Sequence, residues 1–323
     1  MTTAPPPPVA GGLTPSQLTT FDRDGYLVIP DALSPATVDA LLAETRSLLE
    51  GLDLSTHPLT RFSTGGDSGR DHVGDAYFLG SGDKVRFFLE EDAFVEGELV
   101  RPKERAVNKI GHCLHELSAP FRQLLLPDAQ SNNRSGSSPA AVARSLGFAD
   151  PRVLQSMVIC KQPEIGGAVP PHQDSCFLYT DPPSAVGFWY ALEDATLQNG
   201  CLSFLPGSHR GAAIRSRLVR SRAGVPDEEA GGTEMVENEG AAFPRGKGYV
   251  EDVGAGDGEY VPAEVKAGTL VLIHGNLLHK SEKNLSQKGR IIYTFHIIEA
   301  EGTVYDEKNW LQPPAGGFTK LYA

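Results

Sequence analysis

The chain has 323 residues, of which 40% are hydrophobic and 22% charged, a composition typical of a globular protein. Its formal net charge of −12 argues against binding along a nucleic-acid backbone, which requires clustered Lys and Arg. No apolar run approaches the roughly 18 residues that a membrane-spanning helix needs, so we expect no membrane segment and no nucleic-acid partner.

The first half of the chain predicts mainly helices. Residues 1–12 contain four consecutive prolines and bury too little apolar surface to offset the entropy of ordering, so we expect a disordered tail. Thr or Ser followed by Pro is typical of a helix start. Helices are expected at residues 14–22, 35–51, 103–117 and 140–147, strands at 25–29 and 84–89, and a flexible Ser- and Asn-rich surface loop at 128–139.

From residue 153 onward the sequence changes to short runs of β-branched and aromatic residues between Gly, Pro and Asn. Strands are expected at residues 153–161, 177–180, 187–192, 201–205, 270–274 and 290–298. Several short strands of this kind indicate a barrel or jelly roll with the earlier helices packed on its outside. We therefore predict one mainly β domain with α decoration over residues 13–323.

His172 and Asp174 form a His-x-Asp triplet on a strand or its leading edge. Alternate strand positions face the same side, so an imidazole and a carboxylate would lie next to each other. Together they can occupy two adjacent positions around a divalent metal, and a distant third ligand would complete a facial triad with open positions. The triplet alone is a weak signal, because it recurs by chance in many chains.

His279 is the candidate third ligand, in the strand-like stretch 270–281 that follows the turn at 266–269, and Arg290 follows it by eleven positions. Arg290 opens an apolar strand, where a buried guanidinium requires an anionic partner. A dicarboxylate cosubstrate would provide one, with Ser281 adding a hydroxyl hydrogen bond. His209 and His274 are rival ligands, although each lies at a turn or strand end where histidines often bond the backbone instead.

These residues, together with NGCLSFLPGSH at 199–209, resemble the phytanoyl-CoA dioxygenase family of Fe(II)- and 2-oxoglutarate-dependent oxygenases. Longer strings at 81–88, 108–112, 155–157, 186–189, 193–196 and 309–313 also carry the resemblance, which covers most of residues 13–323. It implies a double-stranded β-helix, which is a cupin-like jelly roll, with His172, Asp174 and His279 holding the iron. It also implies 2-oxoglutarate contacts at Lys109, Met157, Trp189, Ser281 and Arg290.

The implied reaction uses O₂ and converts 2-oxoglutarate to succinate and CO₂ while a small-molecule substrate is hydroxylated. Asp174 favours hydroxylation, because related halogenases carry a small residue at the carboxylate position. Without the resemblance, Trp189 would be interpreted as core and Lys109 as a solvated charge on a helix. Two other classes stay open, namely a cupin-like barrel holding another metal for a non-oxidative reaction, and a binding module without turnover.

Residues 210–262 are too long for a simple connection, and their Gly-rich part is typical of a mobile lid. The stretch begins with five arginines, at positions 210, 215, 217, 220 and 222. One interpretation is a solvated surface loop. The sharper hypothesis is a lid over the iron in which Arg217 and Arg220 bind an anionic group of the substrate.

The four cysteines lack Cys-x-x-Cys spacing, which favours buried free thiols over a zinc site or disulfide framework. The first residues lack a basic segment followed by an apolar stretch, and the last residues differ from a peroxisomal signal. We therefore expect a cytoplasmic monomer whose partner is a small molecule.

Overall fold

The computed structural model describes residues 9–62, 64–65, 71–72, 74–126, 138–245 and 258–322. Most of the tail expected at 1–12, most of the loop expected at 128–139 and part of the lid expected at 210–262 lie outside these residues. Within them, no helix is both long enough and apolar enough to cross a bilayer. The four cysteines are free thiols, as predicted, and three of them are buried.

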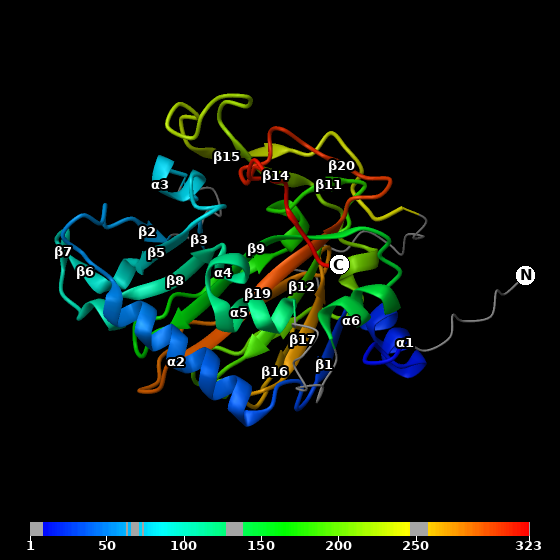
Figure 1. Ribbon diagram of the computed structural model, residues 1–323, viewed down its shortest axis with the longest axis horizontal. Helices are drawn as coiled ribbons and strands as arrows, with labels where there is room; N and C mark the ends of the chain where they lie inside the picture. Colours follow the sequence, from blue (N-terminus) through cyan, green and yellow to red (C-terminus); the bar gives the residue numbers. More distant parts are fainter. Residues whose placement is uncertain are drawn as a thin grey trace, which may run out of the picture.

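The helices lie mainly in the first half of the chain (Figure 1). They are α1 (Pro15–Asp24), α2 (Pro35–Gly51), α3 (Ala76–Leu79), α4 (Leu114–Leu117), α5 (Ala119–Leu125) and α6 (Pro139–Ser145). Thr14 caps α1 through a reciprocal pair of hydrogen bonds with Gln17, and the Ser34 hydroxyl accepts from the Thr37 N–H at the start of α2. These caps satisfy N–H groups that lack partners within the helix, which explains why both predicted helix starts are confirmed.

Two sheets form the centre of the molecule. The larger has nine strands in the order β1-β17-β12-β19-β9-β8-β5-β2, with β21 also paired to β9. Their bounds are β1 Tyr26–Ile29, β17 Leu270–His274, β12 Val186–Ala191, β19 Arg290–Glu299, β9 Pro151–Lys161, β8 Val107–His112, β5 Val85–Glu90, β2 Arg61–Phe62 and β21 Thr319–Lys320. The smaller sheet has the order β10-β18-β13-β16, with bounds Val169–His172, His279–Ser281, Leu202–Phe204 and Val261–Ala263.

Shorter strand pairs complete the fold. They are β14 (Ser216–Arg220) with β15 (Thr233–Glu237), β11 (Thr180–Asp181) with β20 (Val304–Tyr305), β6 (Phe94–Val95) with β7 (Glu98–Leu99), and β3 (Thr64–Gly65) with β4 (Asp71–His72). The β14–β15 hairpin accounts for much of the described part of the expected lid. Leu218 of this hairpin packs in a buried cluster with Leu178 and Trp310, so the hairpin is anchored to the rest of the fold.

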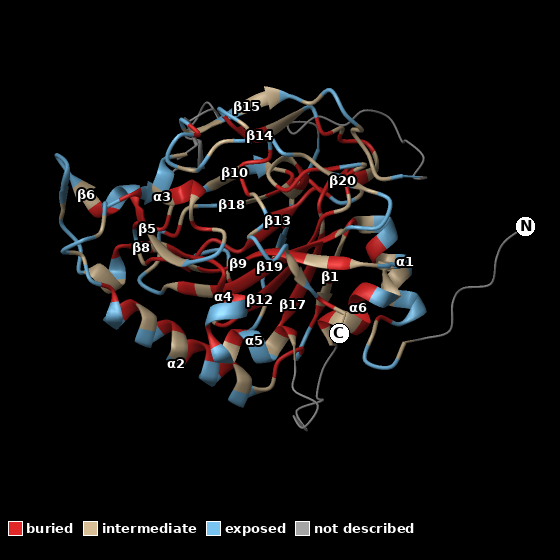
Figure 2. Cartoon of the chain, turned by 45° about the horizontal axis from the view of Figure 1, so that its top comes forward, coloured by how far each residue is buried: buried red, intermediate tan, exposed pale blue. Residues whose placement is uncertain are grey.

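The two faces of the larger sheet have different environments, and successive side chains along each strand point to alternate faces. In β19, Tyr293 and Phe295 pack in the core cluster that also contains buried side chains of α2, α5 and α6. Ile292 of β19 and Trp189 of β12 point the other way, into a cluster shared with Phe204 of the smaller sheet. Figure 2 shows this layering, with α2 and α5 on one side of the buried strands and β10, β18 and β13 on the other. The chain is therefore mainly β with helices on the outside, as predicted.

The helix predicted at 103–117 is wrong over most of its length. A 3₁₀ turn at Lys103–Arg105 leads into strand β8, and only Leu114–Leu117 is α-helical. β8 pairs antiparallel with β5 on one side and β9 on the other. Backbone pairing with a strand on each side, and burial between those strands, outweigh the helical spacing of the apolar residues.

The strand predicted at 177–180 is also wrong. The chain forms a 3₁₀ helix at Asp174–Cys176, and the N–H groups of Phe177 and Leu178 both donate to the Asp174 carbonyl. Extended structure begins only at Thr180. The turn satisfies the backbone groups locally, so the apolar residues that follow face the interior without pairing in a sheet.

We expect Leu272→Ala to lower the free energy of unfolding by about 2–5 kcal/mol, because it leaves a cavity in a packed core. Leu272 is fully buried on β17, on the face of the sheet that packs against the helices. Leu285 is 77% exposed, so Leu285→Ala is the matched control and should change stability by no more than about 0.5 kcal/mol. Urea unfolding measures both variants, and equal effects would contradict the described packing.

Candidate metal centre and its cavity

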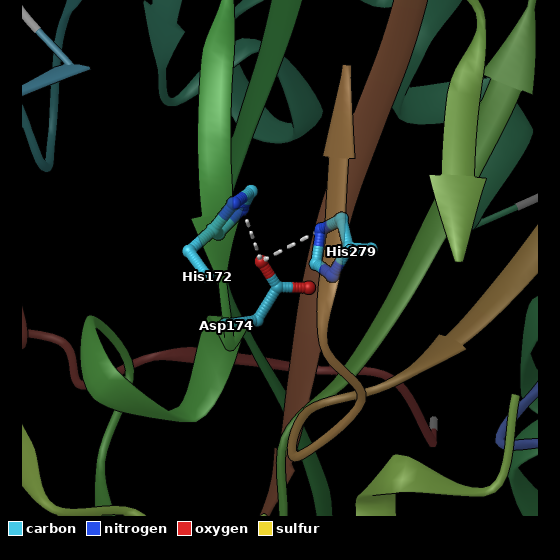
Figure 3. Close-up of side chains that lie close together, drawn as sticks. All are labelled: His172, Asp174 and His279. Atoms are coloured by element: carbon cyan, nitrogen blue, oxygen red, sulfur yellow. Dashed lines mark ion pairs between the residues drawn. The ribbon is translucent and has the colours of Figure 1, made fainter. Parts of the chain in front are cut away.

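Three side chains, two from neighbouring strands and one from the turn after the first strand, converge at one point, shown in Figure 3. His172 ends β10 and His279 begins β18, and the two residues are direct partners in the antiparallel register. Asp174 follows as the first residue of the 3₁₀ helix. One nitrogen or oxygen atom from each of the three lies within 4.8 Å of the others. His172 and Asp174 thus share a site as predicted, although the strand ends before Asp174 and a turn brings the carboxylate back.

Backbone carbonyls fix the tautomer of both imidazoles. The Nδ1 atom of His172 lies 2.9 Å from the Pro170 carbonyl oxygen, and Nδ1 of His279 lies 3.0 Å from that of Leu277. A carbonyl oxygen only accepts hydrogen bonds, so each Nδ1 carries the hydrogen and each Nε2 presents an electron pair. These Nε2 atoms lie 3.7 and 3.8 Å from Oδ1 of Asp174.

The donor set therefore fits a divalent metal. Two imidazole nitrogens and one carboxylate oxygen face each other without a hydrogen between them, an arrangement that a cation would stabilise. Histidine ligands of metals commonly donate their other ring N–H to a backbone carbonyl, as both do here. Two histidines and one carboxylate form a facial triad that leaves further coordination positions open.

The protonation states favour the same conclusion. Burial, with a contribution from His279, lowers the pKa of His172 to about 4. Burial would raise the pKa of Asp174, but the nearby His296 and His279 outweigh it and hold that pKa below its usual range. Nε2 of His296 lies 3.3 Å from the second carboxylate oxygen. At neutral pH the site presents a neutral imidazole at His172 and an ionised carboxylate, the forms that bind metals.

The rival histidines lie elsewhere. His209 and His274 pack together, with ring centroids 4.9 Å apart, and His209 bonds the Asp22 carbonyl at the end of α1. His112 bonds the Ser81 hydroxyl, whereas His115 bonds Ser156. Among the described residues, only the His172, Asp174 and His279 cluster has metal-binding spacing.

The metal cluster opens into a cavity of about 490 Å³. All five residues that the resemblance implies for 2-oxoglutarate line it, namely Lys109, Met157, Trp189, Ser281 and Arg290. Trp189, Thr294 and Met157 are cross-strand partners on β12, β19 and β9. Their common position follows from strand geometry, since paired residues on adjacent strands point to the same face.

Arg290 is buried in this cavity without an anionic partner. It is 3% exposed, donates to the Gly200 carbonyl at 2.6 Å, and lies 5.5 Å from the centroid of the Trp189 ring. Burial lowers the pKa of Arg290 to about 10, so the guanidinium keeps its charge at neutral pH. No carboxylate of the described residues forms an ion pair with it, and a buried cation of this kind requires an anion from elsewhere.

Lys161 is a second buried cation that the sequence interpretation missed. It is the direct partner of Arg290 on the adjacent strand, and its Nζ lies 2.8 Å from the Ser281 hydroxyl and bonds the Glu282 carbonyl. Burial, followed by the charge of Arg290, lowers the pKa of Lys161 to about 7. Lys161 stands four positions after Met157 in a predicted strand, so alternation could have placed both on one face.

Gly200 makes room for this pair of cations. Its φ of +79° lies in the left-handed region, and a Cβ there would collide with the Glu282 carbonyl and approach Nζ of Lys161 to 3.0 Å. Only glycine adopts this conformation without strain and also leaves space beside Lys161. The NGC sequence thus brings a carbonyl close enough to bond Arg290.

Lys109 and the two arginines of the expected lid have different surroundings. Lys109 lies on strand β8, with Nζ 3.6 Å from the centroid of the Phe62 ring, and burial lowers its pKa to about 7. Arg217 pairs with Asp306, and Arg220 pairs with Asp227. Neither arginine lines the cavity. The structure thus brings Lys109 to the site but leaves Arg217 and Arg220 in ion pairs apart from it.

Comparisons with known proteins agree with this geometry. The family model described as phytanoyl-CoA dioxygenase (PhyH) matches residues 21–292. The chain is 43% identical to phytanoyl-CoA dioxygenase domain-containing protein 1 of Bos taurus, over 96% of this chain and 99% of that protein. It is 39% identical to a phytanoyl-CoA dioxygenase of Arabidopsis thaliana, over 94% of this chain and 95% of that protein.

The fold is similar to that of several solved structures, including the following two. One is EctD from S. alaskensis with 2-oxoglutarate and 5-hydroxyectoine, with a TM-score of 0.54, 20% identity, and coverage of 91% of this chain and 79% of that chain. The other is the non-heme α-ketoglutarate-dependent carbocyclase SnoK, with a TM-score of 0.54, 20% identity, and coverage of 94% and 90%.

We expect His279→Ala to weaken Co(II) binding by more than the roughly 10- to 100-fold loss typical of outer-shell partners, because it removes a direct ligand. The matched control is His274→Ala, which alters a histidine outside the cluster. Titration followed by the visible absorption of bound Co(II) measures both variants. Loss of binding in His274→Ala, with binding retained in His279→Ala, would assign the ligands differently.

Proposed function

The chain belongs to the phytanoyl-CoA dioxygenase family, and we propose that it is an Fe(II)- and 2-oxoglutarate-dependent dioxygenase that hydroxylates a small organic molecule. The observation that carries this proposal is a three-ligand cluster beside a cavity containing Arg290, a buried cation without an anion. A metal site alone fits many reactions. A metal site together with an unpaired buried guanidinium fits a metal that works with an anionic cosubstrate.

The two central sheets form, in this proposal, a double-stranded β-helix of the jelly-roll or cupin-like kind. Support comes from the arrangement of the strands, because the smaller sheet faces the larger one and the metal cluster lies on its first two strands. The similarity in fold to EctD and SnoK also supports it. Sites between the sheets of such barrels are enclosed by side chains that alternate inward along each strand.

His172, Asp174 and His279 would hold Fe(II), which, together with O₂ and 2-oxoglutarate, supplies the oxidising chemistry. The protein contributes position and charge. Arg290 and Ser281 would bind the far carboxylate of 2-oxoglutarate, with the guanidinium offering two parallel N–H donors. Lys161 would add a second positive charge at the same place, because it already bonds the Ser281 hydroxyl.

Met157, Trp189 and Lys109 would shape the rest of the cosubstrate site. Trp189 lies beside the Arg290 guanidinium and limits its movement, and the apolar surface of Trp189 and Met157 excludes water from the bound anion. Excluding water strengthens every charge interaction in the cavity. Lys109 would supply a further positive charge from β8.

Hydroxylation is favoured over halogenation, because Asp174 keeps the carboxylate ligand in place and leaves no room for a halide at that position. A non-oxidative cupin-like enzyme remains the alternative, but it gives no reason for Arg290 to be buried without an anion. A binding module without turnover would have no need for a complete ligand set. The anionic-substrate hypothesis for Arg217 and Arg220 has no cavity contact that supports it.

We expect Arg290→Ala to raise the KM for 2-oxoglutarate by roughly 30- to 1,000-fold, equivalent to about 2–4 kcal/mol for a buried charge-assisted pair. Iron binding should survive, since Arg290 is not a ligand. Arg152→Ala is the control, because Arg152 is on the adjacent strand but pairs with Asp150 outside the cavity. Succinate formation measures the KM, and an unchanged KM with lowered iron content would make Arg290 a structural residue.

We also expect the affinity for 2-oxoglutarate to fall as the pH rises from 7 to 8.5. Lys161 has a pKa of about 7 in the free protein, so a growing share of it is neutral above this pH. A bound dianion favours the charged form and raises that pKa, so binding takes up a proton and weakens as protons become scarce. Arg290, with a pKa of about 10, stays charged throughout.

Calorimetric titration of the Zn(II)-loaded protein with 2-oxoglutarate at several pH values measures this effect. Lys161→Met should bind more weakly at pH 7 and show a flatter dependence on pH. Any slope that remains in the variant is assigned to Lys109 and Glu90, which also line the cavity and whose pKa values are also about 7. An identical slope in the wild type and in Lys161→Met would exclude Lys161 from the cosubstrate site.

A further inference from the structure

The cavity has an apolar end whose side chains are distinct from Arg290 and Ser281. Its side chains, called the aromatic wall here, are Phe62, Phe78, Phe177, Leu178, Leu218 and Trp310. The rings of Phe78 and Trp310 are stacked, with centroids 4.4 Å apart. These residues pack in a buried cluster separate from the one that contains Trp189. The wall is therefore a packed apolar surface suited to a flat or elongated organic group.

Two buried polar groups border this end without hydrogen-bond partners. Gln155 is 6% exposed, and neither its side-chain oxygen nor its side-chain nitrogen bonds a described residue. Trp310 is 3% exposed, and its Nε1 has no acceptor. Leaving such groups unpaired costs free energy comparable to a lost hydrogen bond. Two unpaired groups bordering one cavity indicate a ligand that completes them.

The position of Gln155 places this ligand beside the metal centre. Gln155 is the cross-strand partner of His296, and His296 lies 3.3 Å from the Asp174 carboxylate. Arg290 is six residues away from His296 along β19, or roughly 20 Å at the usual rise of a strand. The unpaired groups and the proposed cosubstrate site thus lie toward opposite ends of the cavity.

The charges at this end select against an ionic ligand. His112, whose ring meets the Trp310 ring edge-on, is neutral because burial lowers its pKa well below the usual value. Of the described residues that line the cavity and contact the aromatic wall, Lys109 is the positively charged one. The proposed function assigns the charge of Lys109 to 2-oxoglutarate. A charged substrate group would lose its hydration here without gaining a counter-ion, whereas an amide or hydroxyl would need only hydrogen bonds.

We infer that the prime substrate has an apolar or aromatic body and an uncharged amide or hydroxyl group, and that Gln155 and Trp310 bind this group. The inference rests on the proposed function, because it assigns the second half of the same cavity. The carboxamide of Gln155 can both donate and accept, and the indole N–H of Trp310 donates. The aromatic wall holds the apolar body, which presents a C–H bond to the metal centre.

A matched set of small probes tests this assignment. 3-Phenylpropionamide, 3-phenylpropionate and 3-phenylpropylamine share one ring and chain but differ in the charge of the end group, and butylbenzene carries no polar group. Binding to the full chain, loaded with Zn(II) and 2-oxoglutarate, is measured by saturation-transfer NMR. The amide should bind about tenfold tighter than either charged probe, the effect of one or two hydrogen bonds in a buried site.

Three variants test which residues cause the preference for the amide probe. Gln155→Leu should weaken the amide about tenfold without weakening butylbenzene, because it removes the hydrogen bonds but keeps the volume. Trp310→Phe keeps an aromatic ring at the wall while deleting the N–H, and should weaken the amide alone. Gln287→Leu, at an exposed position, is the control. Melting temperatures distinguish these effects from a loss of fold.

Each outcome decides between the two proposals. Tightest binding by the carboxylate would overturn the inference and reassign Lys109 to the substrate, and equal or absent binding of all probes would also overturn it. Iron-dependent succinate release is measured separately, both without a probe and with the amide present. Succinate release without amide preference refutes the inference and leaves the proposed function standing. Amide preference without succinate release supports the binding site and refutes the proposed function.

Discussion

The structure depends on holding three electron-pair donors close together in a buried place. Two imidazole nitrogens and a carboxylate repel one another unless a cation lies between them, so the fold must supply the force that keeps them together. It does so through the β10–β18 pairing, which makes His172 and His279 direct partners, and through the turn that returns Asp174 to the same point. The Pro170 and Leu277 carbonyls orient the two rings. The two central sheets can be understood as the frame for this cluster.

Within that frame, alternate side chains of one strand have different roles. On β19, Tyr293 and Phe295 pack against the helices, whereas Arg290, Thr294 and His296 face the cavity. The same strand therefore stabilises the fold with one set of side chains and builds the site with the other. Arg290, the charged member of the second set, is tolerated in the interior because its proposed partner is an anion that the protein itself does not contain.

Part of this arrangement was predictable from the sequence. The sequence placed His172, Asp174 and His279 in one metal cluster, and the family resemblance added five residues that line the cavity. Local patterns failed where tertiary pairing decided the structure, as in β8, where ladders on both sides outweighed helical spacing. Lys161 was missed because its role depends on which strand lies beside it. Trp310 reaches the cavity from near the end of the chain, a placement that no local pattern encodes.

The aromatic wall is built differently from the metal centre, and this difference has an evolutionary consequence. Phe78 lies in the short helix α3, and Leu218 lies in the β14–β15 hairpin. Trp310 lies in the segment between β20 and β21. None of the three belongs to either central sheet, whereas the metal ligands come from the smaller sheet and the turn after β10. Mutations in these segments can remodel the wall while the iron ligands stay in register. A lineage with this architecture can therefore acquire new substrates by drift in peripheral segments, while the oxidative chemistry is inherited unchanged.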